Sequence, residues 1–392
     1  MIPYAKHDLS EEDVDAVVSA LREAFITQGP VVPSFEQAFG QYVQAEHSVA
    51  VNSGTAALHV ACRALDLGPG DILWTSPISF VASANCGIYC GASVDFVDID
   101  PETGLMSVSK LAEKLRAAAD TDRLPKVVIP VHYAGQCCDM EKIFALAGEY
   151  GFQIIEDACH ALGGRFQGEP VGSCKFSHIS TFSFHPAKVM TTAEGGMAAT
   201  NDADLASKMR KLRSHGISRD ESDMPSAMNE AWYYQQLMEG FNYRMPDVLA
   251  AMGISQLKRV DHFVERRGDL ANLYTQQIKG LPVKPLRVCA NQHSGHHLYV
   301  VRTPVTGGRA LRDSILHGLQ ERGIGANLHY IAIHTQPFYR KCGFQPSDFP
   351  DAVAFSDRVL SLPLYASLTE ADLAIVVDAL RESVELGARH RS

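Results

Sequence analysis

A lysine with apolar neighbours stands just after a predicted strand of this 392-residue chain. Lys188 closes the run 183–188 (SFHPAK), and a run rich in threonine and glycine, 191–196 (TTAEGG), follows it. Apolar surroundings desolvate an amine and lower its pKa, which favours the neutral form that attacks a carbonyl group to give a Schiff base. Because most lysines are solvated surface residues, Lys188 is a candidate only together with other groups.

Three other segments carry groups that suit a flat, phosphorylated ligand. Asp157 ends an apolar run, at the edge where ligands of open α/β sheets bind, although a carboxylate that caps the next turn is the plainer interpretation. Gly54 and Thr55 join a strand to a helix, and a free helix N-terminus attracts phosphate, although an ordinary turn has the same pattern. Phe80 follows another predicted strand and is placed to stack on an aromatic ring or to fill the core. Along the chain the phosphate turn (Gly54, Thr55) comes first, then the aromatic ring (Phe80), the acid (Asp157) and the lysine (Lys188). This order supports the four interpretations jointly.

The elements that position these residues alternate between strands and helices. Between the apolar runs lie helical patterns, and this β-α-β rhythm predicts a mostly parallel sheet with both faces covered. The runs 179–184 and 196–200 are too close in sequence for a crossover helix, which predicts one antiparallel strand there. The predicted strands are 49–51, 72–75, 94–97, 127–131 and 153–156, and the helices between them are 55–65, 80–90 and about 140–150.

Outside this region the sequence predicts further helices and a second, smaller α/β unit. Ser10 is placed to cap a first helix, and Thr369, with Asp372 three residues on, is placed to cap the last. The predicted division is a large domain over 1–245 and a small domain over 246–392. The remaining predicted elements are a polar excursion at 218–230, long helices over 247–279, an apolar strand at 298–301, and helices at 311–322 and 370–380.

Composition excludes several classes of protein. A net charge of −10 argues against a partner with a phosphate backbone, so no nucleic-acid binding is expected. The nine cysteines lack the paired spacing of zinc sites or of a secreted disulfide scaffold, which indicates reduced thiols and a cytoplasmic location. No apolar stretch approaches the roughly 18 residues of a membrane span, so no membrane partner is expected. His293, His296 and His297 lack the spacing of a zinc site, and no metal is expected.

Together these segments resemble the DegT/DnrJ/StrS family of sugar aminotransferases over nearly the whole chain. Four segments are similar to the pseudaminic acid branch of that family, the UDP-4-keto-6-deoxy-N-acetylhexosamine 4-aminotransferases. The resemblance implies an α/β fold, the pyridoxal-phosphate (PLP) dependent transferase fold type I, with a mostly parallel seven-stranded sheet flanked by helices and a smaller C-terminal α/β domain. The four segments are 76–82 (SPISFVA), 213–217 (RSHGI), 232–234 (WYY) and 240–245 (GFNYRM).

The resemblance also implies a role for each candidate residue. Lys188 would hold pyridoxal 5'-phosphate as a Schiff base and, once released, would move a proton. Asp157 would bind the pyridinium nitrogen, His160 would lie beside the ring hydroxyl, and Phe80 would stack on the ring. The phosphate contacts implied are Gly54, Thr55, Ser183 and, from a second subunit, Asn242. The substrate contacts implied are Tyr4, Ala24, Phe25, Ile26, Thr27, His329 and Tyr330.

The implied reaction is a ping-pong transfer of an amino group from L-glutamate to C4 of a UDP-linked 4-keto-6-deoxy-N-acetylhexosamine, carried out by a homodimer with shared active sites. A perosamine-type or bacillosamine-type sugar stays open as the acceptor. Dehydratase relatives have histidine in place of Lys188, and a non-catalytic sensor is disfavoured by the intact cofactor set.

Two departures from the family are Ile331-Ala332, where a proline is common, and Cys159, where Ala or Ser is usual. His132 follows a strand and is either a ligand contact or a structural residue.

Overall fold

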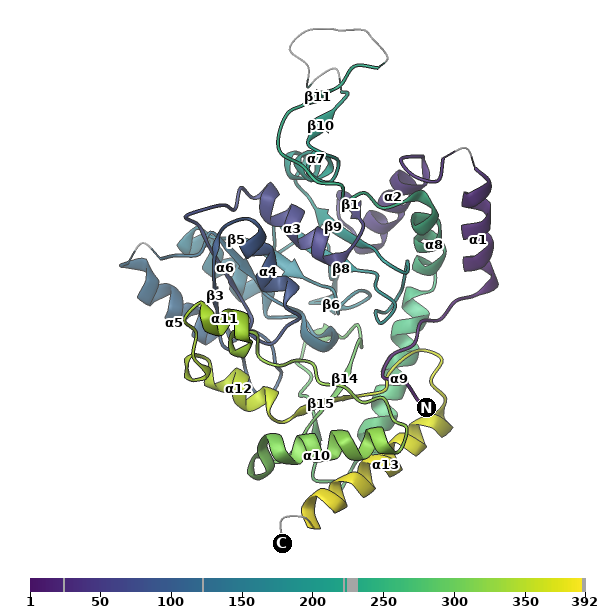
Figure 1. The fold of residues 1–392 in the computed structure, drawn as a ribbon, viewed down its shortest axis with the longest axis vertical. Coiled ribbons are helices and arrows are strands. Elements are labelled where there is room, and N and C mark those ends of the chain that lie inside the picture. The colour runs from purple at the N-terminus through teal and green to yellow at the C-terminus, as the bar shows by residue number, and fades with distance from the viewer. Residues whose placement is uncertain (24, 122, 221–222, 224–231, 390–392) are drawn as a thin grey trace.

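A seven-stranded sheet forms the centre of the protein, and its strand order is β1-β9-β8-β5-β4-β2-β3. The computed structural model describes all residues except 24, 122, 221–222, 224–231 and 390–392 (Figure 1). Strand β9 pairs antiparallel with both β1 and β8, while the other pairs are parallel. The predicted antiparallel strand is therefore confirmed. The strands are β1 (His47–Val51), β2 (Ile72–Thr75), β3 (Ser93–Phe96), β4 (Val127–Ile129), β5 (Gln153–Asp157), β8 (Ile179–Ser183) and β9 (Gly196–Thr200).

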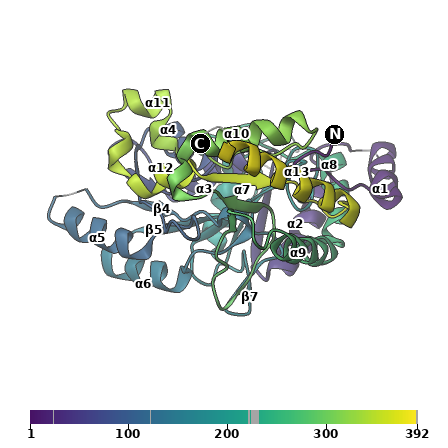
Figure 2. The same cartoon turned by 90° about the horizontal axis from the view of Figure 1, so that it is seen from below.

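Helices cover both faces of this sheet, and its central strands β8, β5 and β4 are accordingly buried along nearly their whole length. Helix α5 and helix α1 lie at opposite ends of the molecule in two perpendicular views (Figure 1, Figure 2). Ser10 caps α1 as predicted: its hydroxyl accepts from the Asp13 amide, and the Asp13 carboxylate accepts from the Ser10 amide. The helices around the sheet are α1 (Glu11–Arg22), α2 (Val31–Val43), α3 (Gly54–Ala64), α4 (Ala82–Tyr89), α5 (Val108–Ala119), α6 (Met140–Tyr150) and α7 (Ala203–Leu212).

The C-terminal part of the chain builds a second, smaller sheet. Its three strands, in the order β12-β14-β15, are antiparallel, and helices α10 and α13 lie below it in Figure 1. Thr369 and Asp372 form the predicted hydrogen bonds at the start of α13. The boundary at residue 246 stays a prediction. The elements are α8 (Asp247–Leu257), α9 (Val260–Gln277), β12 (Lys284–Pro285), β14 (Tyr299–Arg302), α10 (Gly308–Glu321), β15 (Val359–Leu362) and α13 (Glu370–Arg389).

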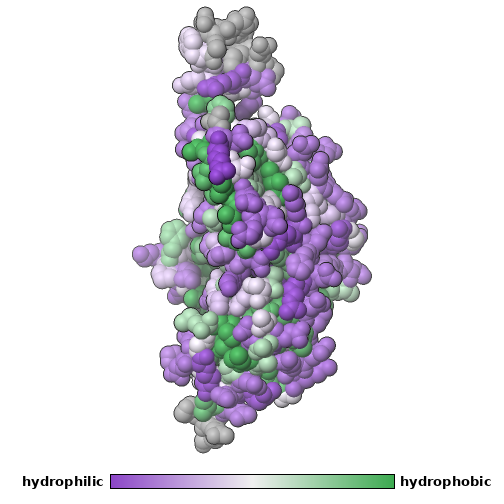
Figure 3. Space-filling view, turned by 90° about the vertical axis from the view of Figure 1, so that its right-hand side faces the viewer, coloured by the Kyte–Doolittle hydropathy of each residue, from purple (hydrophilic) through white to green (hydrophobic). Residues whose placement is uncertain are grey.

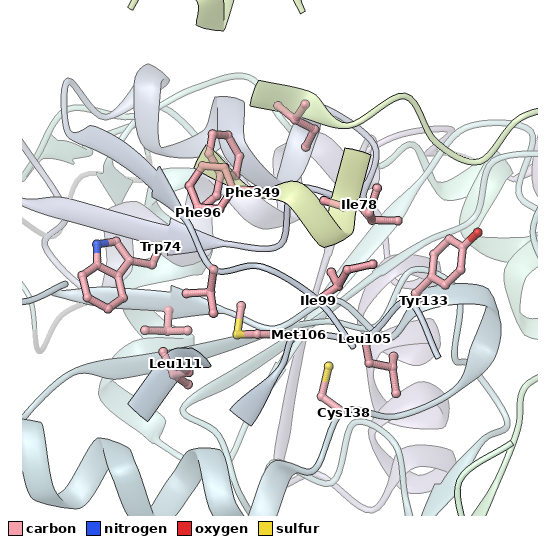
Figure 4. Close-up of a cluster of buried hydrophobic side chains, with 14 of the residues drawn as sticks. Trp74, Ile78, Phe96, Ile99, Leu105, Met106, Leu111, Tyr133, Cys138 and Phe349 are labelled. Carbon is pink, nitrogen blue, oxygen red and sulfur yellow. The ribbon is translucent and has the colours of Figure 1, made fainter. Parts of the chain in front are cut away.

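Two short helices of this C-terminal part return to the large sheet. Helix α12 (Pro350–Ser356) contacts α5 through the ion pair of Asp351 with Lys110, and helix α11 (Pro337–Lys341) lies beside α4 (Figure 1, Figure 2). Phe349 packs edge to face on Phe96 at 5.7 Å between ring centroids, within the buried cluster drawn in Figure 4. The two parts of the chain therefore share one hydrophobic cluster, and the loop before α11 is held against the large sheet.

A narrow hairpin projects from the top of the molecule in Figure 1. It consists of β10 (Ile217–Ser218) and β11 (Gln235–Gln236), and most of the predicted polar excursion between them lies outside the described residues. Polar residues cover much of the face shown in Figure 3, with apolar residues in patches between them. None of the helices in the described part of the chain combines the length and the apolar character that a membrane crossing requires.

Candidate active site

A pocket of about 520 Å³ opens at the carboxyl edge of the parallel strands. Its wall is formed by the turns after β1, β2, β5 and β8, by the N-terminal segment, and by residues 327–330. The position at the strand ends is the one expected for ligands of open α/β sheets. The predicted residues that the structure brings together here are Tyr4, Gly54, Thr55, Phe80, Asp157, His160, Ser183, Lys188, His329 and Tyr330.

The first turn of α3 forms an anion cradle at one end of the pocket. Ser53 caps the helix, and its hydroxyl accepts from the Ala56 amide at 3.1 Å. A Cβ atom on Gly54 would lie only 2.7 Å from the Cβ of Ser183, so the helix start and the end of β8 are in backbone contact. Free N–H groups of a first helical turn attract negative charge, and the Ser183 hydroxyl lies beside them. This cradle suits a phosphate.

Replacing Gly54 by alanine is expected to weaken both folding and cofactor binding. The added methyl group would force α3 away from Ser183, and overpacking of this kind lowers the free energy of unfolding by about 1–3 kcal/mol. A displaced cradle should also weaken PLP affinity by about tenfold, since one misplaced anion contact is worth about 1.4 kcal/mol or more. Thermal melting and fluorescence titration of the apo protein with PLP would measure the two effects. Gly68→Ala is the matched control, because nothing lies within 4 Å of a Cβ built there.

The carboxylate of Asp157 is buried at the end of β5 and held by two donors. Its Oδ2 accepts from the Ser83 hydroxyl at 2.6 Å, and its Oδ1 accepts from the Cys159 amide at 3.2 Å. Ser83 in turn lies 2.6 Å from the Ser79 hydroxyl. Asp157 therefore both caps the following turn and lines the pocket. The two interpretations of the sequence, a turn cap and a residue at the ligand site, are compatible. Ser83 and Ser79 were not predicted, and their only signal is the four-residue spacing at the start of a helix.

The Lys188 amine faces the same pocket from the turn after β8. Burial in the pocket wall lowers the pKa of Lys188, although the nearby Cys159 and Asp157 groups oppose that shift. The shift increases the fraction of neutral amine near physiological pH. Lys188 and Asp157, from different strands, thus line one cavity, as a covalently held pyridine ring would require.

The lowered pKa of Lys188 predicts the pH dependence of cofactor loading. Only the neutral amine attacks an aldehyde, so loading is slow below the pKa of the amine and reaches its plateau above it. The midpoint of the loading rate of the apo protein is therefore expected below about 10.4, the ordinary value of lysine. Stopped-flow absorbance with PLP across a pH series would measure it. A midpoint at the ordinary lysine value would contradict the burial of this amine.

A wall of aromatic and histidine rings closes the other side of the pocket. The Tyr330 hydroxyl and His160 Nε2 lie 3.0 Å apart, and the His160 and His297 rings are 4.3 Å apart between centroids. Burial lowers the pKa of both histidines, so both rings are neutral. Their Nδ1 atoms are buried without a hydrogen-bond partner among the described residues. His297 was considered in the sequence only as a metal ligand, and its place in this wall was missed.

Tyr4, His329 and Phe80 complete the pocket mouth. The Tyr4 and His329 rings are 5.5 Å apart, and His329 Nδ1 lies 2.8 Å from the Ser361 hydroxyl. Phe80 is 59% exposed and 6.5 Å from the Tyr330 ring, so its face is free to stack on a ligand. The loop after Tyr330 has Ile331-Ala332 where the family commonly has a proline. It is nevertheless held in place, because the Ile333 amide donates to the Pro77 carbonyl at 2.8 Å.

Several predicted residues do not line the pocket of their own chain. Phe25, Ile26 and Thr27 are exposed, and their segment is anchored by the Asp247 amide, which donates to the Ile26 carbonyl. Asn242 is also exposed, and its carbonyl accepts from the Asn52 side chain. Ala24 lies outside the described residues. The substrate and phosphate roles of these residues stay predictions.

His132 is a structural residue in this fold. It is fully buried, does not line the pocket, and places Nε2 2.7 Å from the Glu156 carboxylate. The Ser180 hydroxyl also donates to Glu156, on the face of β5 opposite Asp157. Within the described residues, no group of three or more His, Cys, Asp and Glu side chains is arranged to hold a metal ion.

The fold and the pocket define a class of protein. A mostly parallel seven-stranded sheet, a helix N-terminus for phosphate, and a lysine and an aspartate at the strand ends are the features of a PLP-dependent transferase of fold type I. The model of the DegT/DnrJ/EryC1/StrS aminotransferase family matches residues 7–381, and the chain belongs to that family. The resemblance noted in the sequence is confirmed.

Relatives with similar sequences and structures cover almost the whole chain. The spore coat polysaccharide biosynthesis protein SpsC of Bacillus subtilis is 38% identical, over 98% of this chain and 97% of that protein. PseC of Helicobacter pylori, an aminotransferase involved in the biosynthesis of pseudoaminic acid, superposes with a TM-score of 0.90 at 30% identity, covering 98% of this chain and 99% of PseC. The putative sugar aminotransferase Spr1654 of Streptococcus pneumoniae, in its PLP form, has a TM-score of 0.89 at 28% identity, covering 98% and 99%.

The cofactor of this family is PLP, and the residues of the pocket fit it. The Gly54 cradle suits the phosphate, the Asp157 carboxylate lines the same pocket and suits a protonated pyridine nitrogen, and the Lys188 amine suits the aldehyde. The orphaned Nδ1 of His160 is a polar atom that a bound ligand would satisfy.

Proposed function

We propose that this protein is a nucleotide-sugar 4-aminotransferase that moves the amino group of L-glutamate to C4 of a UDP-linked 4-keto-6-deoxy-N-acetylhexosamine. The observation that carries the proposal is the placement of Lys188 and Asp157 in one pocket, with the Gly54 cradle at its end. The structural likeness to PseC supports a pseudaminic acid type of acceptor. The likeness to SpsC, a polysaccharide biosynthesis protein, supports a sugar product more generally.

The chemistry divides between the cofactor and the residues of the chain. PLP, when bound, supplies an aldehyde and an electron sink for the bond that breaks next to nitrogen. Lys188 would hold the cofactor through its aldehyde carbon, and its free amine would serve as the base that moves a proton during the transfer. The Asp157 carboxylate, oriented by the Ser83 hydroxyl, would keep the proton on the ring nitrogen of the bound cofactor. The Tyr330 and His160 rings keep water from this face of the pocket.

We further propose that the active enzyme is a homodimer. Asn242 and the segment 25–27 are exposed and lie outside their own pocket, so a second chain is the partner in which they could meet a ligand. An isologous interface would then build two equivalent sites. Size-exclusion chromatography with light scattering tests this, and a fully active monomer would contradict it.

An absorbance experiment tests the function and names the acceptor sugar. The PLP-loaded protein is expected to lose its Lys188-dependent visible band on addition of L-glutamate and to recover it with the right keto sugar. The acceptors to compare are UDP-linked 4-keto-6-deoxy-N-acetylhexosamines of the pseudaminic and bacillosamine types and a GDP-linked keto sugar of the perosamine type. Recovery with only the perosamine-type sugar would overturn the proposed acceptor, and a band that glutamate does not bleach would overturn the proposed amino donor.

A further inference from the structure

Three of the nine free cysteines meet where helices α3 and α4 pack against each other. Cys86 and Cys90 are four residues apart at the end of α4, so they face the same side. Cys62 lies opposite them on α3, and side-chain hydrogen bonds connect its thiol to both. All three lie outside the lining of the pocket. The proposed reaction therefore leaves this cluster of thiols without a role.

Cys90 has the surroundings of a reactive thiol. Burial raises the pKa of Cys62, which therefore keeps its proton and donates a hydrogen bond to Cys90. That hydrogen bond lowers the pKa of Cys90, and the nearby His59 ring and Arg63 guanidinium lower it further, although burial opposes the shift. The thiolate, rather than the thiol, is the nucleophile in cysteine chemistry. The cluster thus pairs an activated sulfur with a second sulfur in hydrogen-bond contact.

The His59 ring offers a hydrogen bond that the rest of the fold does not use. Its Nδ1 atom lies 3.1 Å from the Tyr243 hydroxyl, whereas its Nε2 atom is buried without a hydrogen-bond partner among the described residues. When the hydroxyl donates to Nδ1, the proton of a neutral ring is on Nε2. A buried N–H without a partner is unfavourable, and an anionic sulfur beside the ring would satisfy it. This second observation also favours a thiolate at Cys90, the thiol that interacts with this ring.

Access also distinguishes Cys90 from other cysteines of the chain. Cys62 and Cys86 are fully buried, whereas Cys90 keeps 4% of its surface exposed at the C-terminal cap of α4, beside the exposed Tyr89 and Gly91. Burial raises the pKa of three enclosed thiols outside the cluster, which keeps them in the unreactive thiol form. These are Cys137, Cys159 and Cys174. A small oxidant is therefore expected to react with Cys90 before these three.

The two helices that carry the thiols also build the pocket. Helix α3 begins at the Gly54 cradle, and α4 carries Ser83, whose hydroxyl donates to the Asp157 carboxylate at 2.6 Å. The Cys86 thiol in turn donates to the Ser83 carbonyl at 3.3 Å. A disulfide requires about 2.05 Å between its sulfur atoms, much shorter than a hydrogen bond between thiols, so bond formation would draw the two helices together. Such a shift would displace the phosphate cradle and the donor that orients Asp157.

We propose that Cys90 and Cys62 are a peroxide-sensitive pair that closes to a reversible disulfide between α4 and α3. The Cys90 thiolate attacks one oxygen of hydrogen peroxide, so that a sulfur–oxygen bond forms, the oxygen–oxygen bond breaks, and the released hydroxide takes up the Cys90 proton as water. The Cys62 sulfur then attacks the sulfur of the sulfenic acid, the sulfur–oxygen bond breaks, and a second water leaves with the Cys62 proton. Two thiols are oxidised and one peroxide is reduced, and an added dithiol reverses the bond. This chemistry does not depend on the identity of the amino donor or of the acceptor sugar.

Mass spectrometry of the PLP-loaded protein tests the pair directly. After brief treatment with hydrogen peroxide, a digest made without reductant is expected to contain the peptides of Cys62 and Cys90 joined by a disulfide, which dithiothreitol separates. Chymotrypsin cleaves after Tyr89, so Cys86 and Cys90 fall in different peptides. Cys62→Ala should stop at the sulfenic acid of Cys90, which dimedone traps. Cys342→Ala, at an exposed cysteine outside the cluster, should form the disulfide as the wild type does and is the matched control.

The affinity for PLP tests the coupling of the pair to the pocket. Oxidation of the wild-type protein is expected to weaken PLP binding by about tenfold, the effect of losing one hydrogen bond to a charged group, and dithiothreitol should restore it. Cys62→Ala should keep its PLP affinity after the same treatment. Fluorescence titration measures this affinity without turnover, so a protein that failed to transaminate would count against the proposed function alone.

Several results would contradict the proposal. Peroxide-treated wild type without a Cys62–Cys90 peptide would refute the pair, as would a disulfide between Cys86 and Cys90 in its place. Oxidation of Cys159 while Cys90 stays reduced would show that Cys90 is not the activated thiol. Full PLP affinity in the oxidised wild type, or a loss of affinity that persists in Cys62→Ala, would refute the link between the disulfide and the pocket.

Discussion

Lys188→Ala is expected to abolish transamination, with kcat reduced by at least about 10⁴-fold. In the proposed reaction this amine would supply two functions from one position, since it would hold the cofactor and move the proton. Alanine provides neither a nucleophile nor a base. Because the side chain lies at the pocket wall, its removal should change activity far more than folding. Steady-state kinetics and the visible absorbance band of the purified variant measure the two losses.

Two comparisons make the Lys188→Ala result specific. Lys175→Ala, at an exposed lysine that pairs with Glu169, should keep full activity and the visible band. Addition of methylamine to Lys188→Ala should restore part of the rate, since a small amine can take the place of the missing base. A Lys188→Ala protein that kept the band and more than about one hundredth of the activity would remove Lys188 from its assigned role.

Asp157→Asn is expected to lower kcat by about 10²- to 10³-fold, the range for loss of one electrostatic contact in a buried site. The amide has the shape of the carboxylate and can still accept from Ser83, so the pocket should keep its form. It cannot hold a proton on a pyridine nitrogen by charge, which weakens the electron sink that the reaction needs. The effect should fall on kcat more than on KM, since ground-state contacts are preserved.

A graded series isolates the charge of Asp157 from its orientation. Ser83→Ala removes one donor to the carboxylate and should reduce kcat by about tenfold or less, in line with a neutral hydrogen bond. The absorbance maximum of the bound cofactor should shift in Asp157→Asn and stay nearly unchanged in Ser83→Ala. Equal activity of Asp157→Asn and wild type would show that this carboxylate only caps its turn.

The strand pattern and the principal site residues could be predicted from the sequence because both are local properties. Apolar runs such as 127–129 mark strands buried on both faces, and the short spacing before β9 excludes a crossover helix. Asp157 ends a strand, and Gly54 and Lys188 each follow one; because the carboxyl ends of parallel strands meet at one edge, the convergence of these residues follows from the fold class. The caps at Ser10 and Thr369 lie within three residues of their partners.

The tertiary structure alone decided which distant segments close the pocket. His297 lies in the C-terminal part and meets His160 because its segment is held against residues 134–135: the Gly295 amide donates to the Gly135 carbonyl, and the Leu298 amide donates to the Ala134 carbonyl. Ser83 reaches Asp157 across 74 residues of sequence. Such contacts depend on the shapes of many side chains at once and leave no periodic trace in the sequence. The same reason applies to Asn242, which pairs with Ser214 and lies outside the pocket of its own chain.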